Sequence, residues 1–312
     1  MGYWYPCKTS EGKRNRVQTR PETLTELAPG LMRILAPNPS PMTYWGTNTY
    51  VLGEGTERVL IDPGPDLAAH RAAVLAALPA DTRISQILVT HAHLDHSAGA
   101  AALSEATDAP ILAFGTAAAG RSAHMAALSD TLGGGEGVDS AFVPDIALPH
   151  GTLLDTPAGP IEALHTPGHM GNHLCFAWRG AVFSGDLIMG WSSSLISPPD
   201  GDAEAFRQSC ALLLRLTPDR LHPGHGDPVE TPRARIEFLL DHRAEREAQI
   251  LAALAQGPMD LMAVTRAVYT DLPPTHLPAA ARNTLAHLVE MTRQKRLIAQ
   301  PKIGINAVFS VP

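Results

Sequence analysis

The stretch THAHLDH, residues 90–96, constrains this chain more than any other, because it directly follows the apolar run at 84–89. It places three imidazoles and a carboxylate within six positions: His91, His93, Asp95 and His96. Imidazole nitrogen and carboxylate oxygen are common ligands of zinc. A polar loop rich in histidine would explain one or two of these residues, but not four behind a buried strand. The stretch therefore predicts a metal site at a strand end.

The spacing of these residues indicates more than one ion. In an extended chain, positions 91, 93 and 95 lie on one side. A helix that begins at His96 would bring that imidazole round to the same place. Four ligands are too many for one tetrahedral ion that keeps an open position, so we expect two ions.

Further candidate ligands stand at the ends of other predicted strands, in HTPGHMGNH, FSGD and LHPGHGD. Each segment has a glycine beside the candidate, which suits a close backbone approach at a turn. The candidates are His165, His169, His173, Asp186, His222 and His225. We interpret His165 and His222, which lie on strands, as packing residues.

Short apolar strands alternate with alanine-rich helices from about residue 48 onward. The segments 48–53 and 58–64 predict a pair of hairpin strands. Residues 115–150, which contain LGGGEG, predict an irregular surface excursion beside the site. A helix is expected near 203–216.

The C-terminal part has a different pattern, with one long helix at 231–255 and Pro232 in its first turn. Two shorter helices and a closing hairpin follow, which is the element order of a winged-helix-like module. We therefore divide the chain into a flexible leader (1–22), a large α/β domain (23–230) and a winged-helix-like domain (231–312). No motif residue lies beyond His225, so a chain ending near Asp241 is expected to keep its metal affinity and lose most turnover.

Composition indicates which partners and which cellular compartment to expect. The net charge is −7, and residues 257–312 carry six Lys/Arg against three Asp/Glu, so an acidic body precedes a mildly basic tail. That balance is only a weak signal for nucleic acid. No apolar run approaches the roughly 18 residues needed to cross a bilayer, so no membrane contact is expected. Three widely spaced cysteines fit a reducing cytoplasm: Cys7, Cys175 and Cys210.

Five motifs occur in a recognisable order: LIDPG, THxHxDH, TPGH, SGD and PGHG. Together they resemble the metallo-β-lactamase superfamily over residues 45–230. With GTNTYVLG and the C-terminal tail, the chain is most similar to the branch typified by beta-lactamase-like protein 2. The resemblance implies an α/β fold, specifically a four-layer αββα sandwich.

The resemblance also implies a role for each motif residue. Asp186 would bridge two metal ions, and Asp62 would orient a ligand. His173 would lie near the substrate, and Asp95 would also carry a proton to the leaving group. One ion would be bound by His91, His93 and His169, and the other by Asp95, His96 and His225.

The implied function is a dinuclear-zinc hydrolase that uses a metal-bridging hydroxide on an ester, thioester or lactone-type small molecule. Iron and manganese are less favoured. Asp186 argues against classical lactamase activity, and PGHGDP argues against glutathione thioesters. The alternative is a single-strand-specific endoribonuclease, with the winged helix as an RNA-docking surface. The oligomeric state stays open, and a homodimer is one option.

Overall fold

The computed structural model describes residues 20–312, so the predicted leader (1–22) lies almost wholly outside the described residues. A seven-stranded sheet has the order β1-β2-β3-β4-β5-β6-β7. Strands β3 and β4 pair antiparallel, as the hairpin prediction requires. Both are buried at nearly every position, which is typical of strands covered on two faces. The strands are β1 (Leu24–Ala28), β2 (Leu31–Leu35), β3 (Asn48–Leu52), β4 (Glu57–Ile61), β5 (Arg83–Leu88), β6 (Ile111–Ala113) and β7 (Ile146–Ala147).

A second sheet of five strands has the order β12-β11-β10-β9-β8. Its pairs are antiparallel except β11 with β12, which run parallel. Parallel strands need a crossover, and α5 (Ala203–Leu216) supplies it. The strands are β8 (Thr152–Leu154), β9 (Ile161–His165), β10 (Leu174–Trp178), β11 (Ala181–Gly185) and β12 (Arg220–Pro223).

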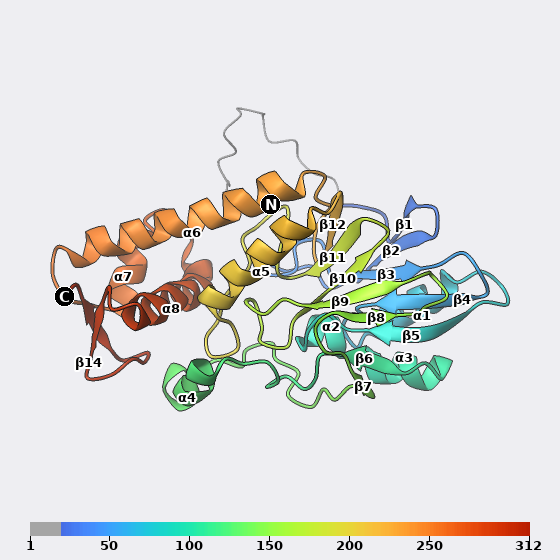
Figure 1. Ribbon diagram of the computed structural model, residues 1–312, viewed down its shortest axis with the longest axis horizontal. Coiled ribbons are helices and arrows are strands. Elements are labelled where there is room, and N and C mark those ends of the chain that lie inside the picture. Colours follow the sequence, from blue (N-terminus) through green and yellow to red (C-terminus); the bar gives the residue numbers. More distant parts are fainter. Residues whose placement is uncertain (1–19) are drawn as a thin grey trace.

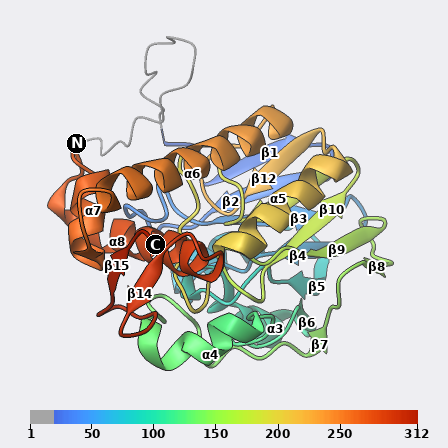
Figure 2. The same cartoon turned by 60° about the vertical axis from the view of Figure 1, so that its left-hand side comes forward.

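Three apolar cores define four layers. One lies between the sheets and includes Tyr50 and Phe176. The second lies between the first sheet and helices α1 (Ala68–Ala76) and α3 (Ala100–Thr107). The third packs α5 and the start of α6 (Pro232–Leu254) on the second sheet. Figure 2 shows α5 and α6 on one side of the sheets and α3 on the other. The expected αββα sandwich is confirmed.

The C-terminal part forms a fourth core beside the sandwich (Figure 1). A three-stranded sheet has the order β13-β15-β14, and β14 and β15 form the predicted closing hairpin. The winged-helix assignment and the domain boundary at 230 stay predictions. The elements are α6 (Pro232–Leu254), β13 (Met259–Asp260), α7 (Leu261–Val268), a short 3₁₀ helix (Pro274–His276), α8 (Leu277–Arg293), β14 (Ile298–Gln300) and β15 (Val308–Ser310).

The expectation of an irregular excursion at 115–150 was wrong for α4 (Ala123–Leu132). Met125 and Leu132 lie seven positions apart on one face of this helix, and both are buried in the C-terminal core. The glycines of LGGGEG only follow its end. The prediction failed because the partner surface of α4 is supplied by residues more than a hundred positions away.

Across residues 20–312, none of the helices combines the length and the apolar character that a bilayer crossing requires.

Candidate metal centre

Seven side chains from four segments meet where strands of the two sheets end. The chain stays extended past β5 and then turns into α2 (Leu94–Ser97), with His96 N–H donating to His93 O at 2.9 Å. Asp186 directly follows β11, and His225 follows β12. Gly224 permits the convergence, because a Cβ there would lie 2.5 Å from Asp186 Oδ1. The predicted set comes together in full: His91, His93, Asp95, His96, His169, Asp186 and His225.

The first group consists of His91, His93 and His169. His93 Nδ1 lies 2.9 Å from His91 Nε2 and 2.9 Å from His169 Nε2. His91 is fully buried, and His169 is 6% exposed. These are the three residues that the family resemblance implies for one ion.

The second group consists of Asp95, His96 and His225. His225 Nε2 lies 3.2 Å from Asp95 Oδ2 and 3.3 Å from His96 Nε2. Asp186 faces both groups, with Oδ2 at 3.3 Å from His225 Nε2 and 3.8 Å from His169 Nε2. Asp186 thus lies between the two groups, and its role as a bridging ligand stays a prediction.

These separations suit metal ions. Zinc–nitrogen distances of about 2.0–2.1 Å put the corners of a tetrahedron about 3.3 Å apart, close to the spacing within each group. The buried Asp186 Oδ1 has no hydrogen-bond partner among the described residues, and His96 Nε2 lies 3.5 Å away as an ion-pair partner. A buried carboxylate oxygen without a hydrogen bond is costly unless a cation lies beside it, and a metal ion would supply that cation here. The donor set therefore fits two divalent ions.

Partners behind the imidazoles fix which nitrogen faces the centre. His169 Nδ1 donates to Leu195 O at 2.6 Å, and His225 Nδ1 donates to Gly46 O at 3.2 Å. His91 Nδ1 lies 3.0 Å from the hydroxyl of Thr90. Such partners orient ligand rings and set their tautomers. Their Nε2 atoms are thereby turned toward the shared space.

Asp62, for which the family resemblance implies an orienting role, contacts the start of this segment. Its Oδ2 lies 2.8 Å from His96 Nδ1, while its two oxygens accept from Thr90 N at 2.7 Å and Thr90 Oγ1 at 2.8 Å. Its φ of 54° lies in the left-handed region, which aspartate tolerates better than most residues. One carboxylate thus holds both the loop and a candidate ligand.

The carboxylates dominate the electrostatics of the second group. Burial alone would lower the pKa of His225, but Asp186 and Asp95 raise it to about 9. Burial would likewise raise the pKa of Asp186, yet His225 and His96 hold it well below its usual range. In the metal-free protein, the protonated ring of His225 therefore supplies positive charge beside the carboxylates, at the place where a metal ion would supply it in the loaded protein.

A family profile described as "Metallo-beta-lactamase superfamily" matches residues 42–225, which is more than half of the chain. The chain belongs to the metallo-β-lactamase superfamily. It is accordingly a metal-dependent hydrolase, and the predicted family resemblance is confirmed.

Individual relatives of this superfamily cover most of the chain. A Drosophila melanogaster protein named "Beta-lactamase-like protein 2 homolog" is 34% identical over 285 residues, covering 88% of this chain and 91% of the relative. An Aspergillus fumigatus protein named "Atrochrysone carboxyl ACP thioesterase" is 31% identical over 235 residues, covering 73% and 66%. The crystal structure of a beta-lactamase domain protein from Burkholderia ambifaria superposes with a TM-score of 0.77 at 21% identity, covering 95% and 96%.

Three other histidines lie in the segments that carry the candidate ligands. His173 has no exposed surface, and its Nδ1 lies 3.0 Å from Thr166 Oγ1. Its predicted place beside the substrate stays a prediction, which this burial does not favour. His165 stacks on Phe114 with ring centroids 3.8 Å apart, and His222 stacks on Phe183 at 5.1 Å. Both agree with the packing interpretation.

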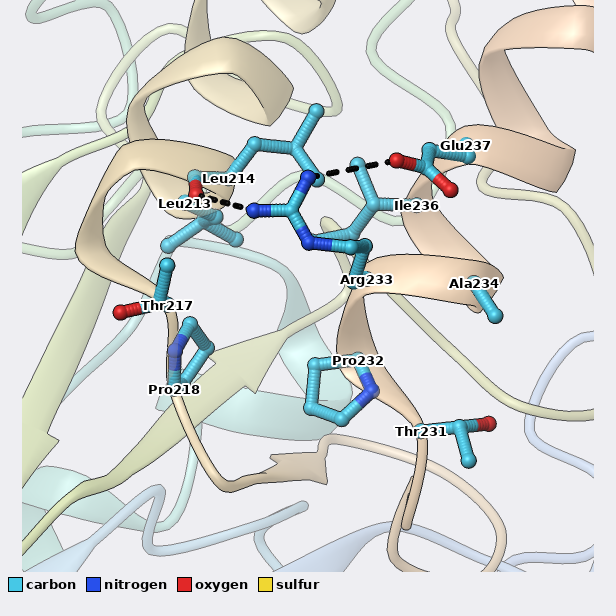
Figure 3. Close-up of a pocket in the computed structure, with 10 residues that line it drawn as sticks. All are labelled: Leu213, Leu214, Thr217, Pro218, Thr231, Pro232, Arg233, Ala234, Ile236 and Glu237. Carbon is cyan, nitrogen blue, oxygen red and sulfur yellow. Dashed lines mark hydrogen bonds and ion pairs between the residues drawn. The ribbon is translucent and has the colours of Figure 1, made fainter.

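A pocket of about 350 Å³ lies elsewhere, between the end of α5 and the start of α6 (Figure 3). Its walls include Leu213 and Ile236, and Arg233 at its edge pairs with Glu237 at 3.3 Å. None of the superfamily motif residues lines it.

The sequence missed the supports of the site. Thr47 Oγ1 donates to Asp95 Oδ2 at 3.1 Å, and backbone carbonyls of Gly46 and Leu195 accept from two candidate ligands. The segment GTNTY carried a signal, since its polar residues precede a buried strand. Leu195 carried no such signal, because it acts through its backbone carbonyl, which every residue has.

Proposed function

We propose that this protein is a dinuclear zinc-dependent hydrolase of acyl thioesters. The observation that carries the proposal is the double donor group with Asp186 between its halves. Three donors on each side and a shared carboxylate suit a pair of ions better than one.

Donor chemistry supports zinc. Five imidazoles and two carboxylates, without a thiolate, match sites that bind zinc and other borderline divalent ions. Iron and manganese accept the same donors and are less favoured. Metal content is therefore part of the test.

Two bound ions would supply a water-derived nucleophile at neutral pH and polarise the attacked carbonyl. The chain's own part is orientation and proton handling. Thr47 holds Asp95 Oδ2 toward the second group, and the Asp95 side chain is 27% exposed. We assign Asp95 a proton relay: its other oxygen would take up the proton released by the attacking water and pass it to the leaving group.

The thioester assignment is supported by the Aspergillus relative, whose name is that of an acyl-carrier thioesterase. A thiolate is a good leaving group, so activation of the nucleophile matters more than activation of the leaving sulfur. Esters and lactones share the carbonyl chemistry and serve as graded comparisons. RNA hydrolysis is the alternative, which the net charge of −7 does not favour.

The test combines metal analysis with a substrate panel. Protein purified without chelator should contain about two equivalents of zinc. It should hydrolyse an acyl thioester of N-acetylcysteamine faster than the matched oxygen ester, a lactone or single-stranded RNA. Cleavage of RNA without thioester hydrolysis would establish the alternative instead.

Substitutions test whether metal binding and activity depend on the candidate ligands rather than on histidines elsewhere in the chain. His93→Ala and Asp186→Ala should each lose metal and lower kcat/KM by more than about 100-fold. This loss is larger than the loss of about 10–100-fold that is typical when a residue behind a ligand is removed. His242→Ala on α6 is the control, and it should keep both. Activity that survived both site variants would refute the dinuclear mechanism.

A further inference from the structure

The segment between Asp186 and α5 is held by side chains from the two long C-terminal helices. Arg235 of α6 donates to Met189 O and Ser192 O, each at 2.7 Å. Arg243 of α6 donates to Ser194 O at 2.8 Å. Three carbonyls of this segment, which has no regular structure, thus accept hydrogen bonds from arginines of α6.

Helix α8 holds the next residues of the same segment. Arg282 Nε donates to Ser197 Oγ at 2.8 Å, and its guanidinium also contacts Pro198 O. Asn283 Oδ1 accepts from Ile196 N at 2.9 Å. Ile196 itself is fully buried, so its N–H has little access to water as a substitute partner.

One peptide group connects Asn283 to the metal centre. The N–H of Ile196 and the C=O of Leu195 are the two ends of the same planar amide. Its N–H donates to Asn283 at 2.9 Å, and its C=O accepts from His169 Nδ1 at 2.6 Å. The side chain of Asn283 and the ring of His169 therefore form hydrogen bonds with opposite ends of one rigid peptide group.

We propose that Asn283 is a positioning residue for His169, acting through the Leu195–Ile196 peptide group. The proposal rests on the proposed role of His169 as a metal ligand. It gives α8, which contributes no ligand, a defined effect on the first donor group.

Two physical effects carry the influence. An acceptor on the N–H polarises the amide and strengthens its carbonyl as an acceptor, because hydrogen bonds in a chain are cooperative. The stronger carbonyl keeps the proton of His169 on Nδ1 and leaves Nε2 free to bind. Fixing the amide plane also fixes the ring, since the 2.6 Å contact ties the two together.

The test compares Asn283→Leu, which removes the acceptor, with Asn283→Asp, which keeps an acceptor oxygen. Thr292→Val is the control, because it deletes a hydrogen bond that stays within α8, from Thr292 Oγ1 to Leu288 O. Each protein is titrated with Co²⁺ and followed by its absorption spectrum. We expect Asn283→Leu to bind one of the two ions about 10–100-fold more weakly. Asn283→Asp and Thr292→Val should resemble the wild type.

A second readout needs no metal. Long-range ¹H–¹⁵N spectra of the metal-free protein report the tautomer of His169. We expect the Nδ1–H form in the wild type and a mixture in Asn283→Leu. An unchanged tautomer together with unchanged Co²⁺ affinity in Asn283→Leu would overturn the proposal.

The two proposals fail in different ways. A wild type that binds no metal would overturn the proposed function, and the tautomer measurement would still decide the role of Asn283. A wild type that binds two ions, with an Asn283→Leu variant that equals it, would overturn only the positioning role. If Asn283→Leu does not fold, Asn283→Ala, which also lacks an acceptor, takes its place in both measurements.

Discussion

Asp62 shows how much one buried carboxylate can organise at the scale of a residue. It accepts two hydrogen bonds from Thr90 and faces Nδ1 of His96, so it sets both the loop and a candidate ligand. An amide in its place could still accept from Thr90, but its NH₂ or its weaker oxygen would face His96.

Asp62→Asn is therefore expected to weaken binding of one metal ion by about 10–100-fold while the fold is kept. Asparagine also tolerates the left-handed backbone at this position, so strain is not added. Metal titration with a competing chelator measures the change. Asp108→Asn is the matched control, an exposed aspartate with a φ of 57° at the end of α3. Equal affinity in the Asp62 and Asp108 variants would contradict this role for Asp62.

The sequence was informative about the candidate ligands and silent about their supports. His91, Asp95 and His96 could be identified because residue type and spacing carry their chemistry. The carbonyl of Leu195 could not, since a backbone group has no signature in the sequence. Asn283 could not either, because its contact with Ile196 spans 87 positions.

Helix α6 is the element that connects the sandwich to the C-terminal part. Its Arg243 is 4% exposed, donates to Ser194 O and lies over the ring of Phe206 at 4.3 Å. Burial lowers the pKa of Arg243 to about 10, so the side chain is still cationic at neutral pH. The helix thus delivers a buried charge to the loop beside the metal centre.

Arg243→Met should lower the free energy of unfolding by about 1–3 kcal/mol, because the buried Ser194 carbonyl loses its donor. Urea unfolding of the metal-free protein measures this. Arg233→Met is the control on the same helix, where the exposed pair with Glu237 should contribute less than about 1 kcal/mol. Similar losses of unfolding free energy in both variants would show that the buried hydrogen bond to Ser194 O contributes no more than the exposed ion pair.

Element prediction succeeded where a local pattern sufficed. The β3–β4 pair, α5 and α6 are found where periodicity and turn residues placed them. Helix α4 was missed, because its apolar face is short and the glycines that directly follow it favoured a loop. Its burial depends on a surface that only the assembled chain provides.

At the scale of the whole molecule, Glu247 joins three helices. From α6 it reaches Arg207 of α5 at 3.4 Å and His287 of α8 at 3.8 Å, and it also pairs with Arg296. His287 acts most strongly, and together with Arg296 it overcomes burial and lowers the pKa of Glu247 to about 2. Glu247 therefore stabilises the fold as an anion.

The sign of the pH effect follows from that depressed pKa. The contribution is fully present above the ordinary glutamate value of 4.5 and is lost as pH falls toward about 2. Glu247→Gln should lower stability at neutral pH, and its difference from the wild type should shrink between these values. Urea midpoints of the metal-free proteins across pH measure this, with Glu245→Gln as the exposed control on α6. A difference that stayed constant down to pH 2.5 would contradict it.

The structure changes the expectation for a chain that ends near Asp241. Such a chain lacks Arg243, Arg282 and Asn283, so the segment beside His169 loses its supports. We now expect weaker metal binding as well as lost turnover, measured by metal analysis of the truncated protein. Two tightly bound equivalents in that protein would restore the simpler expectation.

The peptide group shared by Asn283 and His169 also bears on how such proteins can be recombined. A chimera that takes its C-terminal part from a relative, with a junction at residue 231, would separate Asn283 from the Leu195–Ile196 amide it fits. The exchangeable unit therefore includes residues 187–200 together with α6 and α8, although these pieces are not contiguous in the chain. Exchanging these pieces together keeps the hydrogen bond between position 283 and the 195–196 peptide group, whereas exchanging the C-terminal part alone puts it at risk.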